Sequence, residues 1–227
     1  MKVMILAAGV GARLRPLTDH TPKPLLKVAG LPLIEHHLRR LAAASLSEVV
    51  INVSHLGGQI EQYCSDGARW GLDLRYSREE VPLETAGGIL HARPLLGKAP
   101  FLVVNGDVWS DFSFGPLLEH PLRDDENARI VLVDNPPQHA AGDFSLDDGG
   151  RVGRKIRDGA SYTYAGIGLY SWRLFAGLSP GKTPLRPLLD AAIDRAELGG
   201  IHYTGGWEDV GTPQRLRQLD ARLGAAG

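Results

Sequence analysis

An uninterrupted apolar run at residues 3–8 leads directly into Gly9 and Gly11, and this junction restricts the fold more than any other part of the sequence. A run without polar alternation is typical of a strand that is buried on both faces of a parallel sheet. Glycines directly after such a strand let backbone amides approach phosphate oxygens, because no side chain blocks them. Taken alone, a Gly-x-Gly also fits an ordinary strand-to-loop turn, so both interpretations stay open at this point.

Two familiar phosphate-loop patterns do not fit this junction. The dinucleotide-binding fingerprint needs a small residue where Leu14 stands, and an acidic residue at the end of the next strand, where residues 52–54 read Asn-Val-Ser. A Walker loop needs Gly-Lys-Ser/Thr at a spacing that the chain does not have. The sequence therefore excludes both patterns.

Strand-like and helix-like segments alternate along the first half of the chain. The apolar spacing predicts helices from about residue 32, at 58–64 and at 85–93, and strands at 48–53, 72–76 and 101–105. This alternation predicts βαβ units with right-handed crossovers, and hence an α/β fold with a mainly parallel sheet. Ligands of such sheets bind where the carboxyl ends of the strands meet the loops.

The second half of the chain has a different pattern. Strands are predicted at residues 128–133 and 162–170, with a hairpin around 147–150, so we expect an antiparallel addition to the sheet. Thr183-Pro184 and Thr212-Pro213 both resemble a helix N-cap followed by proline at the first helical position. Each is followed by an apolar stripe at helical spacing, which predicts two docked helices.

Composition limits the function classes. The chain has 227 residues, no internal repeat and no linker, which predicts one domain. A formal net charge of −1 argues against a protein that coats nucleic acid, which normally needs a strongly basic face. A single cysteine, Cys64, favours a reducing cytoplasm. The run at residues 3–8 is too short for a signal peptide, and no apolar stretch approaches the roughly 20 residues that cross a bilayer.

Two cations and two carboxylates are candidates for phosphate chemistry. Arg13 and Lys23 flank a segment stiffened by prolines beside the glycine loop. Asp107 follows the predicted strand at 101–105, and Asp209 lies far along the chain between Trp207 and Gly211. Each acid also fits a turn or helix cap, but two carboxylates together suit Mg²⁺, which takes hard oxygen ligands.

Four segments in order resemble the motifs of the sugar-1-phosphate nucleotidylyltransferases. Leu6-Ala-Ala-Gly-Val-Gly-Ala-Arg13, with Pro22-Lys-Pro-Leu25, resembles the N-terminal signature of that family. Residues 83–88 (Leu-Glu-Thr-Ala-Gly-Gly) resemble its base-contacting segment, and 104–107 (Val-Asn-Gly-Asp) its metal-binding strand end. Residues 207–213 (Trp-Glu-Asp-Val-Gly-Thr-Pro) are similar to its C-terminal metal motif.

This resemblance implies a Rossmann-like, mainly parallel sheet flanked by helices, of the nucleotide-diphospho-sugar transferase type, with a small antiparallel sugar-binding addition. It implies a single domain over residues 1–227, in which about 1–110 bind the nucleotide and about 111–227 the sugar. The implied reaction joins a sugar 1-phosphate to a nucleoside triphosphate and releases pyrophosphate. Mg²⁺ would be held by Asp107 and Asp209, with Arg13 and Lys23 on the phosphates.

The resemblance also implies two groups of binding residues. The nucleotide would contact the first strand end, the glycine loop and the segment that follows residue 79, namely Leu6, Ala7, Ala8, Gly9, Gly11, Glu80, Thr85 and Gly87. The sugar phosphate would contact Asn105, Gly142, Lys155, Tyr164 and Gly166.

Residues 83–89 in so short a chain look similar to the bacterial N-acetylmuramate 1-phosphate uridylyltransferases of cell-wall recycling. That similarity implies UTP as the nucleotide donor. The common family run has glycine where this chain has Glu84. A lactyl carboxylate on the sugar would need a cation, for which Arg154 and Arg157 are the candidates.

Three alternatives stay open. The first is another hexose-1-phosphate uridylyl-, guanylyl- or thymidylyltransferase, and the other two lie outside that reaction. A GT-A glycosyltransferase also binds a nucleotide sugar through a metal at a strand end, but normally shows Asp-x-Asp, whereas Asp107 is followed by Val108 and Trp109. A non-catalytic nucleotide-sugar sensor would not need both cations and both acids. The eight histidines lack the spacing of a metal-binding helix, so we assign them no catalytic role.

Overall fold

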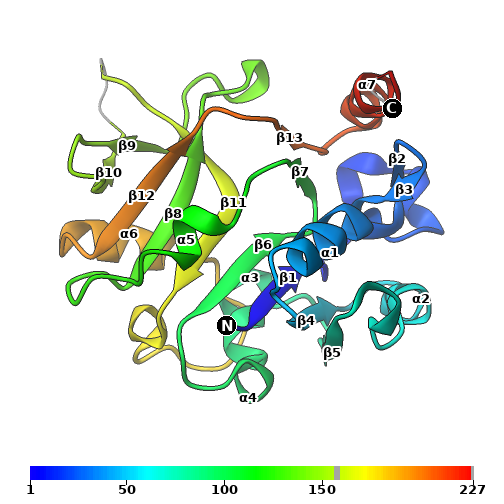
Figure 1. Ribbon diagram of the computed structural model, residues 1–227, viewed down its shortest axis with the longest axis horizontal. Coiled ribbons are helices and arrows are strands. Elements are labelled where there is room, and N and C mark those ends of the chain that lie inside the picture. Colours follow the sequence, from blue (N-terminus) through cyan, green and yellow to red (C-terminus); the bar gives the residue numbers. More distant parts are fainter. Residues whose placement is uncertain (156–158, 226–227) are drawn as a thin grey trace.

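The computed structural model describes residues 1–155 and 159–225. A seven-stranded sheet with the order β12-β8-β11-β6-β1-β4-β5 forms its centre (Figure 1). Parallel pairing joins β1 to β4 and β6, and β4 to β5, as the alternation of strands and helices predicts. The strands of this sheet are β1 (Val3–Leu6), β4 (Glu48–Val53), β5 (Asp73–Arg78), β6 (Phe101–Asn105), β8 (Ala128–Val133), β11 (Thr163–Tyr170) and β12 (Leu198–Tyr203).

Helices cover both faces of the sheet, because each central strand is apolar on both sides. Ile5 of β1 packs in the core that includes Ile34 and Leu38, whereas its neighbour Met4 packs in the core that includes Ile89. None of the helices in the described residues is long and apolar enough to span a membrane. The helices are α1 (Leu33–Ala43), α2 (Gly57–Cys64), α3 (Glu84–His91), α4 (Arg93–Leu96), α5 (Gly115–Leu118), α6 (Arg186–Asp194) and α7 (Pro213–Gly224).

Three small antiparallel pairs complete the fold. They join β2 (Lys27–Val28) to β3 (Leu31–Pro32), β7 (Val108–Ser110) to β13 (Trp207–Asp209), and β9 (Phe144–Leu146) to β10 (Val152–Arg154). The pair β9–β10 is the predicted hairpin. The predicted antiparallel addition also includes β11, which runs antiparallel to β6 and β8, but β12 pairs parallel with β8 in the same sheet.

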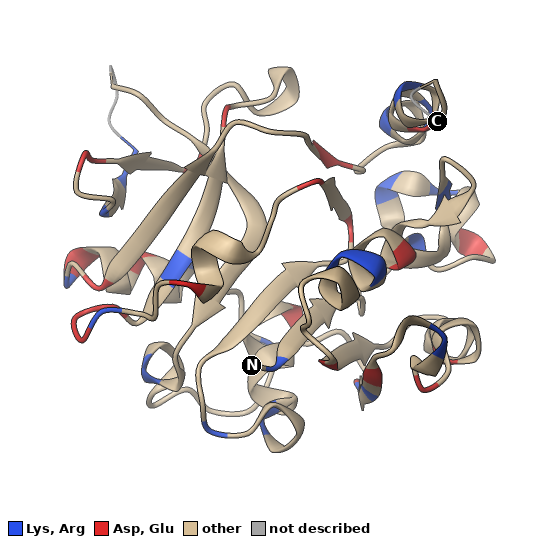
Figure 2. Ribbon diagram, in the orientation of Figure 1, with Lys and Arg blue, Asp and Glu red and all other residues tan. Residues whose placement is uncertain are grey.

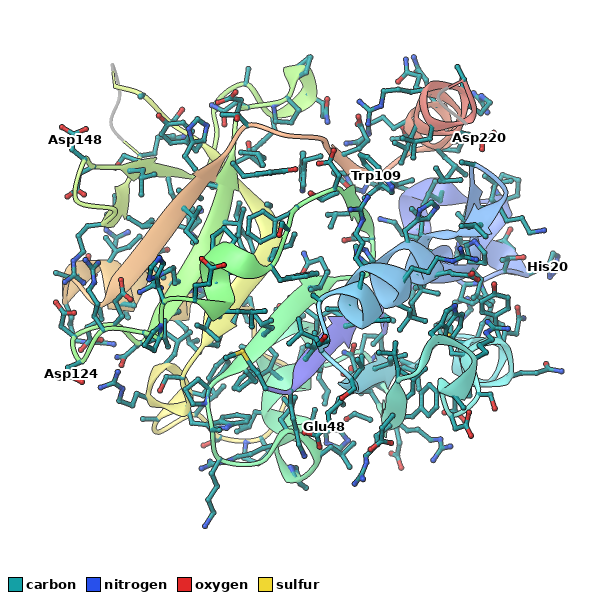
Figure 3. The ribbon with its side chains drawn as sticks, in the orientation of Figure 1. His20, Glu48, Trp109, Asp124, Asp148 and Asp220 are labelled. Carbon is teal, nitrogen blue, oxygen red and sulfur yellow. The ribbon has the colours of Figure 1, made fainter. Side chains whose placement is uncertain are left out.

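The last helix, α7, packs over β2, as the apolar stripe after Thr212 predicts (Figure 1). Leu219 is buried in a small core with Val28 and Trp109, and Trp109 comes from β7 (Figure 3). Thr212 caps the helix, since its hydroxyl oxygen accepts a hydrogen bond from the Arg215 backbone N–H at 3.3 Å. Helix α7 therefore ties the C-terminal segment to β7 and to the β2–β3 pair.

The prediction that Thr183 caps a helix is wrong. Helix α6 begins at Arg186 with Leu185 at its N-cap, and no side chain caps it. The Thr183 backbone instead bonds to the start of α3: its N–H donates to the Leu83 carbonyl at 2.9 Å, and its carbonyl accepts from Gly87 at 3.1 Å. This tertiary contact holds the Thr183 backbone, and the helix begins three residues later.

Candidate active site

A cavity of about 450 Å³ opens at the carboxyl end of β1. Arg13, Lys23 and Asp107 line it together with the glycine loop. These residues come from separate segments, which the parallel pairing of β1 with β6 brings to the same edge of the sheet. The sequence-predicted nucleotide residues that line it are Leu6, Ala7, Ala8, Gly9, Gly11 and Thr85.

The shape of the glycine loop depends on Gly11. Its φ of +63° lies in the left-handed region, and a Cβ added there would come within 2.8 Å of the Thr18 Cγ2. The Thr18 hydroxyl donates a hydrogen bond to the Gly11 carbonyl at 2.9 Å. The Thr18 side chain therefore packs against one side of the loop. The other side of the loop lines the cavity.

A buried chain of polar side chains, which the sequence did not predict, supports the loop. Asn52, at the end region of β4, accepts a hydrogen bond from the Ala7 N–H at 2.8 Å and donates one to Glu79 Oε1 at 2.7 Å. The other oxygen of Glu79 accepts from the Leu83 N–H at 2.9 Å. Both side chains line the cavity and are buried. An asparagine inside an apolar strand was the signal that could have pointed to this chain.

Lys23 holds Asp107 at the cavity wall. Its Nζ lies 2.8 Å from Asp107 Oδ2, and its side chain is only 8% exposed, whereas that of Asp107 is 44% exposed. A buried ammonium needs a partner, and the carboxylate supplies one. Both residues line the cavity, and the pair engages one of the two Asp107 carboxylate oxygens.

Asp209 lies beside Asp107 in space. Strand β13 pairs with β7 so that Asp209 is opposite Val108, and the Val210 N–H donates to the Asp107 carbonyl at 3.2 Å. Figure 2 shows β13, which carries acidic residues, running beside β7. Arg215 of α7 donates to Asp209 Oδ2 at 2.8 Å. Asp209 on β13 therefore lies close to Asp107, the residue directly before β7, although Asp209 is not among the residues that line either large cavity.

The donor set fits a magnesium ion better than a metal held by protein alone. In the described part of the chain, no three His, Cys, Asp or Glu side chains gather as a metal cluster. Mg²⁺ is usually bound by one or two carboxylates, with phosphate oxygens and waters completing the octahedron. Asp107 and Asp209 match that requirement in number and chemistry.

A second cavity of about 510 Å³ shares Glu84, Thr85 and Asn105 with the first, and Tyr164 also lines it. Burial raises the pKa of Tyr164 to about 12, so its hydroxyl stays protonated and bonds to the Tyr170 hydroxyl at 2.7 Å. Among the described residues, the buried Asn105 Oδ1 has no hydrogen-bond partner. An unpaired buried acceptor between two cavities is suited to a ligand donor.

Gly166 makes room for Asn105. Its φ is +75°, and an added Cβ would lie 2.7 Å from Asn105 Nδ2 and 2.8 Å from its Cβ. The register of β11 against β8 shifts between Tyr164 and Gly168, which is the irregularity that contains this glycine. The predicted sugar residues Asn105, Tyr164 and Gly166 thus lie close together.

Other predicted residues lie elsewhere. Glu80 is exposed and lines neither cavity, whereas its neighbour Glu79 lines the first. Gly87 and Gly142 are buried: a Cβ on Gly87 would collide with the Gly181 carbonyl, and one on Gly142 would meet Asn135 Oδ1 at 2.6 Å. Lys155 is exposed and lines neither cavity.

The two arginines suggested for a sugar carboxylate do not line the cavities either. Arg154 donates to both oxygens of Asp194, at 3.0 and 2.8 Å, and lies 3.7 Å from Asp190. Arg157 lies outside the described residues. Arg186 is the arginine that lines the second cavity, and its guanidinium lies 4.4 Å from the centre of the Phe144 ring.

The family model described as nucleotidyl transferase matches residues 2–225. The chain belongs to this family. Its relatives include the N-acetylmuramate alpha-1-phosphate uridylyltransferase of Neisseria meningitidis serogroup B, which is 47% identical over 99% of both chains. The enzyme of that name from Caulobacter vibrioides is 35% identical over 98% of this chain and 97% of its own. A mannose-1-phosphate guanyltransferase from Hypocrea jecorina is 30% identical over 94% of this chain and 62% of its own.

Solved structures share the nucleotidyl transferase fold. A Bacillus anthracis protein, a candidate glucose-1-phosphate thymidylyltransferase in complex with sucrose, superposes with a TM-score of 0.87 at 24% identity, covering 99% of this chain and 95% of its own. HddC from Yersinia pseudotuberculosis, complexed with GMP-PN, gives a TM-score of 0.78 at 20% identity, covering 98% and 99%. At these identities the structures support the fold alone. They agree with the mainly parallel sheet expected from the sequence.

Proposed function

We propose that this nucleotidyl transferase joins N-acetylmuramate 1-phosphate to the uridylyl group of UTP, giving UDP-N-acetylmuramate and pyrophosphate. The near full-length similarity to two enzymes of that name supports the choice of both substrates. The observation that carries the proposal is the pairing of β13 with β7, which brings the backbone of Asp209 close to Asp107, and Asp107 lines the glycine-loop cavity.

The reaction is a single displacement at phosphorus. An oxygen of the sugar phosphate forms a bond to the α-phosphorus of UTP, and the bond from that phosphorus to the bridging oxygen of the β-phosphate breaks. Pyrophosphate leaves with the electron pair. The attacking oxygen is already ionised near neutral pH, so no general base is required. The barrier is the approach of two polyanions, which positioned cations lower.

Asp107 and Asp209 would hold Mg²⁺, which supplies charge neutralisation at the α-phosphate when bound. Lys23, which is buried beside Asp107, steers the phosphates. Arg13, which follows the glycine loop and lines the same cavity, stabilises the departing pyrophosphate. Backbone amides around Gly9 and Gly11 contact the nucleotide.

The second cavity is the proposed sugar site. It adjoins the first through Thr85 and Asn105, so a sugar placed there presents its phosphate toward Asp107. Tyr164 and the apolar side chains of Phe144 and Leu189 line this cavity. We also infer a cytoplasmic site of action, because the lone Cys64 suits a reducing compartment.

Pyrophosphate release tests the function directly. The wild-type protein is incubated with Mg²⁺, each of four nucleoside triphosphates, and a panel containing the 1-phosphates of N-acetylmuramate, N-acetylglucosamine, glucose and mannose. We expect the highest kcat/KM for UTP with N-acetylmuramate 1-phosphate. Pyrophosphate release with only a different pair of substrates would mean that the enzyme uses that pair instead. Transfer of sugar from a nucleotide sugar, without pyrophosphate release, would indicate a glycosyltransferase.

A further inference from the structure

Glu84 has a backbone conformation that its side chain disfavours. Its φ is +60°, in the left-handed region, where a residue with a long side chain is an outlier. Five other non-glycine residues of the described chain share a positive φ, and none of them lines either large cavity: Ala29, Ser45, Leu56, Ser65 and Ala196. Glu84 lines both cavities. Strain of this kind, held at a ligand site, points to a function for the side chain.

The charge of Glu84 restricts what that function can be. The residue begins α3 at the junction of the two cavities, where two polyanionic substrates would meet. A carboxylate there repels phosphate and cannot donate a hydrogen bond, so its useful partners are neutral N–H or O–H donors. Lys182 lies 3.5 Å from Glu84 Oε1 in an exposed pair, which offsets part of the charge but orders neither side chain strongly.

The second cavity has one other carboxylate, and that one is already in use. Asp143 Oδ1 lies 3.0 Å from His139 Nε2, and Oδ2 accepts from the Tyr164 N–H at 2.9 Å. Within the described residues, the only ion pair of the Glu84 side chain is the one with Lys182. Glu84 is therefore the carboxylate of this cavity that has oxygens to offer to a sugar.

We propose that the Glu84 carboxylate accepts a hydrogen bond from a hydroxyl or amide N–H group of the sugar 1-phosphate, and that the left-handed backbone is retained because it aims this side chain into the sugar cavity. The inference rests on the proposed function. It adds a sugar-selecting residue at a position where the backbone conformation by itself would favour glycine.

Two variants separate substrate recognition from folding. Glu84→Gly removes the carboxylate and relieves the strain, and Glu84→Gln keeps an acceptor oxygen without the charge. Ser45→Gly is the matched control, because Ser45 has a φ of +58°, is exposed and lines neither large cavity. The KM for each substrate is measured from pyrophosphate release with the other substrate saturating, and the melting temperature is measured for every variant.

For Glu84→Gly we expect the KM for the sugar 1-phosphate to rise about tenfold to a hundredfold, as when a hydrogen bond to a charged acceptor is lost. The KM for UTP should change less than about twofold, and the melting temperature should not fall, since glycine accepts this φ. Glu84→Gln should raise the sugar KM by a smaller factor. Ser45→Gly should alter neither KM.

An unchanged sugar KM in Glu84→Gly, or an equal rise in the KM for UTP, would overturn the inference. A melting temperature several degrees below wild type would also overturn it, because the residue would then serve the fold. Failure of the proposed function is a separate result, seen as no pyrophosphate release by the wild-type protein. Calorimetric binding of N-acetylmuramate 1-phosphate to wild type and Glu84→Gly then decides the inference without turnover, and equal affinity would reject it.

Discussion

Lys23 Nζ lies 2.8 Å from Asp107 Oδ2, and the two side chains differ sharply in exposure, at 8% and 44%. The Lys23 ammonium is therefore buried beside the cavity, whereas the Asp107 carboxylate is partly exposed at the cavity wall. A cation that is buried on one side is weakly screened by solvent, so its effect on a phosphate exceeds that of a surface lysine. This pair connects the loop after β1 to the end of β6.

Replacing Lys23 with methionine tests the role of this cation. We expect kcat/KM for pyrophosphate release to fall about a hundredfold or more, because a positioned charge on the phosphates is lost. The fold should persist, since methionine fills the buried stem and Asp107 reaches solvent. Lys27→Met is the control, as Lys27 is exposed on β2. Wild-type kcat/KM in Lys23→Met would contradict the assignment.

Arg215 should position Asp209 for magnesium. Its guanidinium donates to Asp209 Oδ2 at 2.8 Å. In Arg215→Ala we expect the Mg²⁺ concentration for half-maximal activity to rise about tenfold, the usual effect of removing a residue that orients a metal ligand. Arg217→Ala on the same helix, where Arg217 is exposed, should leave it unchanged. Direct Mg²⁺ binding by calorimetry provides a readout independent of turnover, and an unchanged affinity in Arg215→Ala would exclude this role.

Gly166 and Gly177 form a matched pair. Their φ values are +75° and +78°, but a Cβ at Gly166 would collide with Asn105, whereas one at Gly177 would meet nothing within 4 Å. Both alanine variants should lose about 1 kcal/mol from backbone strain. Gly166→Ala should lose more and should also raise the KM for the sugar 1-phosphate, because Asn105 must move. Denaturant unfolding and kinetics together test this, and equal behaviour of the two variants would contradict it.

His37 should make stability depend on pH. Burial lowers the pKa of His37 from 6.5 to about 4, and its Nε2 lies 2.8 Å from the Val108 carbonyl oxygen. Below pH 6.5 the unfolded chain binds a proton that the folded chain resists, so the free energy of unfolding decreases as pH falls from 6.5 toward 4. The total is about 3 kcal/mol. His37→Gln should flatten this part of the profile, whereas His20→Gln, at an exposed site, should not.

Cys64 should be inert in the folded protein. It is fully buried, and burial raises the pKa of its thiol to about 12. The thiolate is the reactive form, so an aromatic disulfide reagent at pH 8 should modify native protein far more slowly than protein unfolded in guanidinium. Comparable rates in both states would mean that α2 opens readily.

Several elements of the fold could be predicted because their signals are local. The strands predicted at residues 48–53, 101–105 and 128–133 have those bounds in the structure. Continuous apolar runs of this length form strands buried on both faces wherever they occur in a parallel sheet. The cap at Thr212 was predictable for the same reason, since the hydroxyl and the N–H that it binds are three residues apart.

Contacts between distant segments could not be predicted in this way. The bond from Asn52 to Glu79 joins β4 to the residue that follows β5, and nothing in the local sequence distinguishes Glu79 from Glu80 as the buried acid. Thr183 was a good local cap, but its backbone bonds to residues 83–87 instead. In each case the competing partner lies on an element that is adjacent only after folding.

The sequence by itself determined where the chain is buried, where it turns and which residues can carry charge to a phosphate, because these properties depend on neighbours a few positions away. Only the tertiary structure decided that Asp209 lies beside Asp107, that Arg215 and Lys23 pair with them, and that a strained Glu84 stands between two cavities. Those relationships depend on the register of strand pairs and on which helix covers them, and register is set by the packing of the whole core.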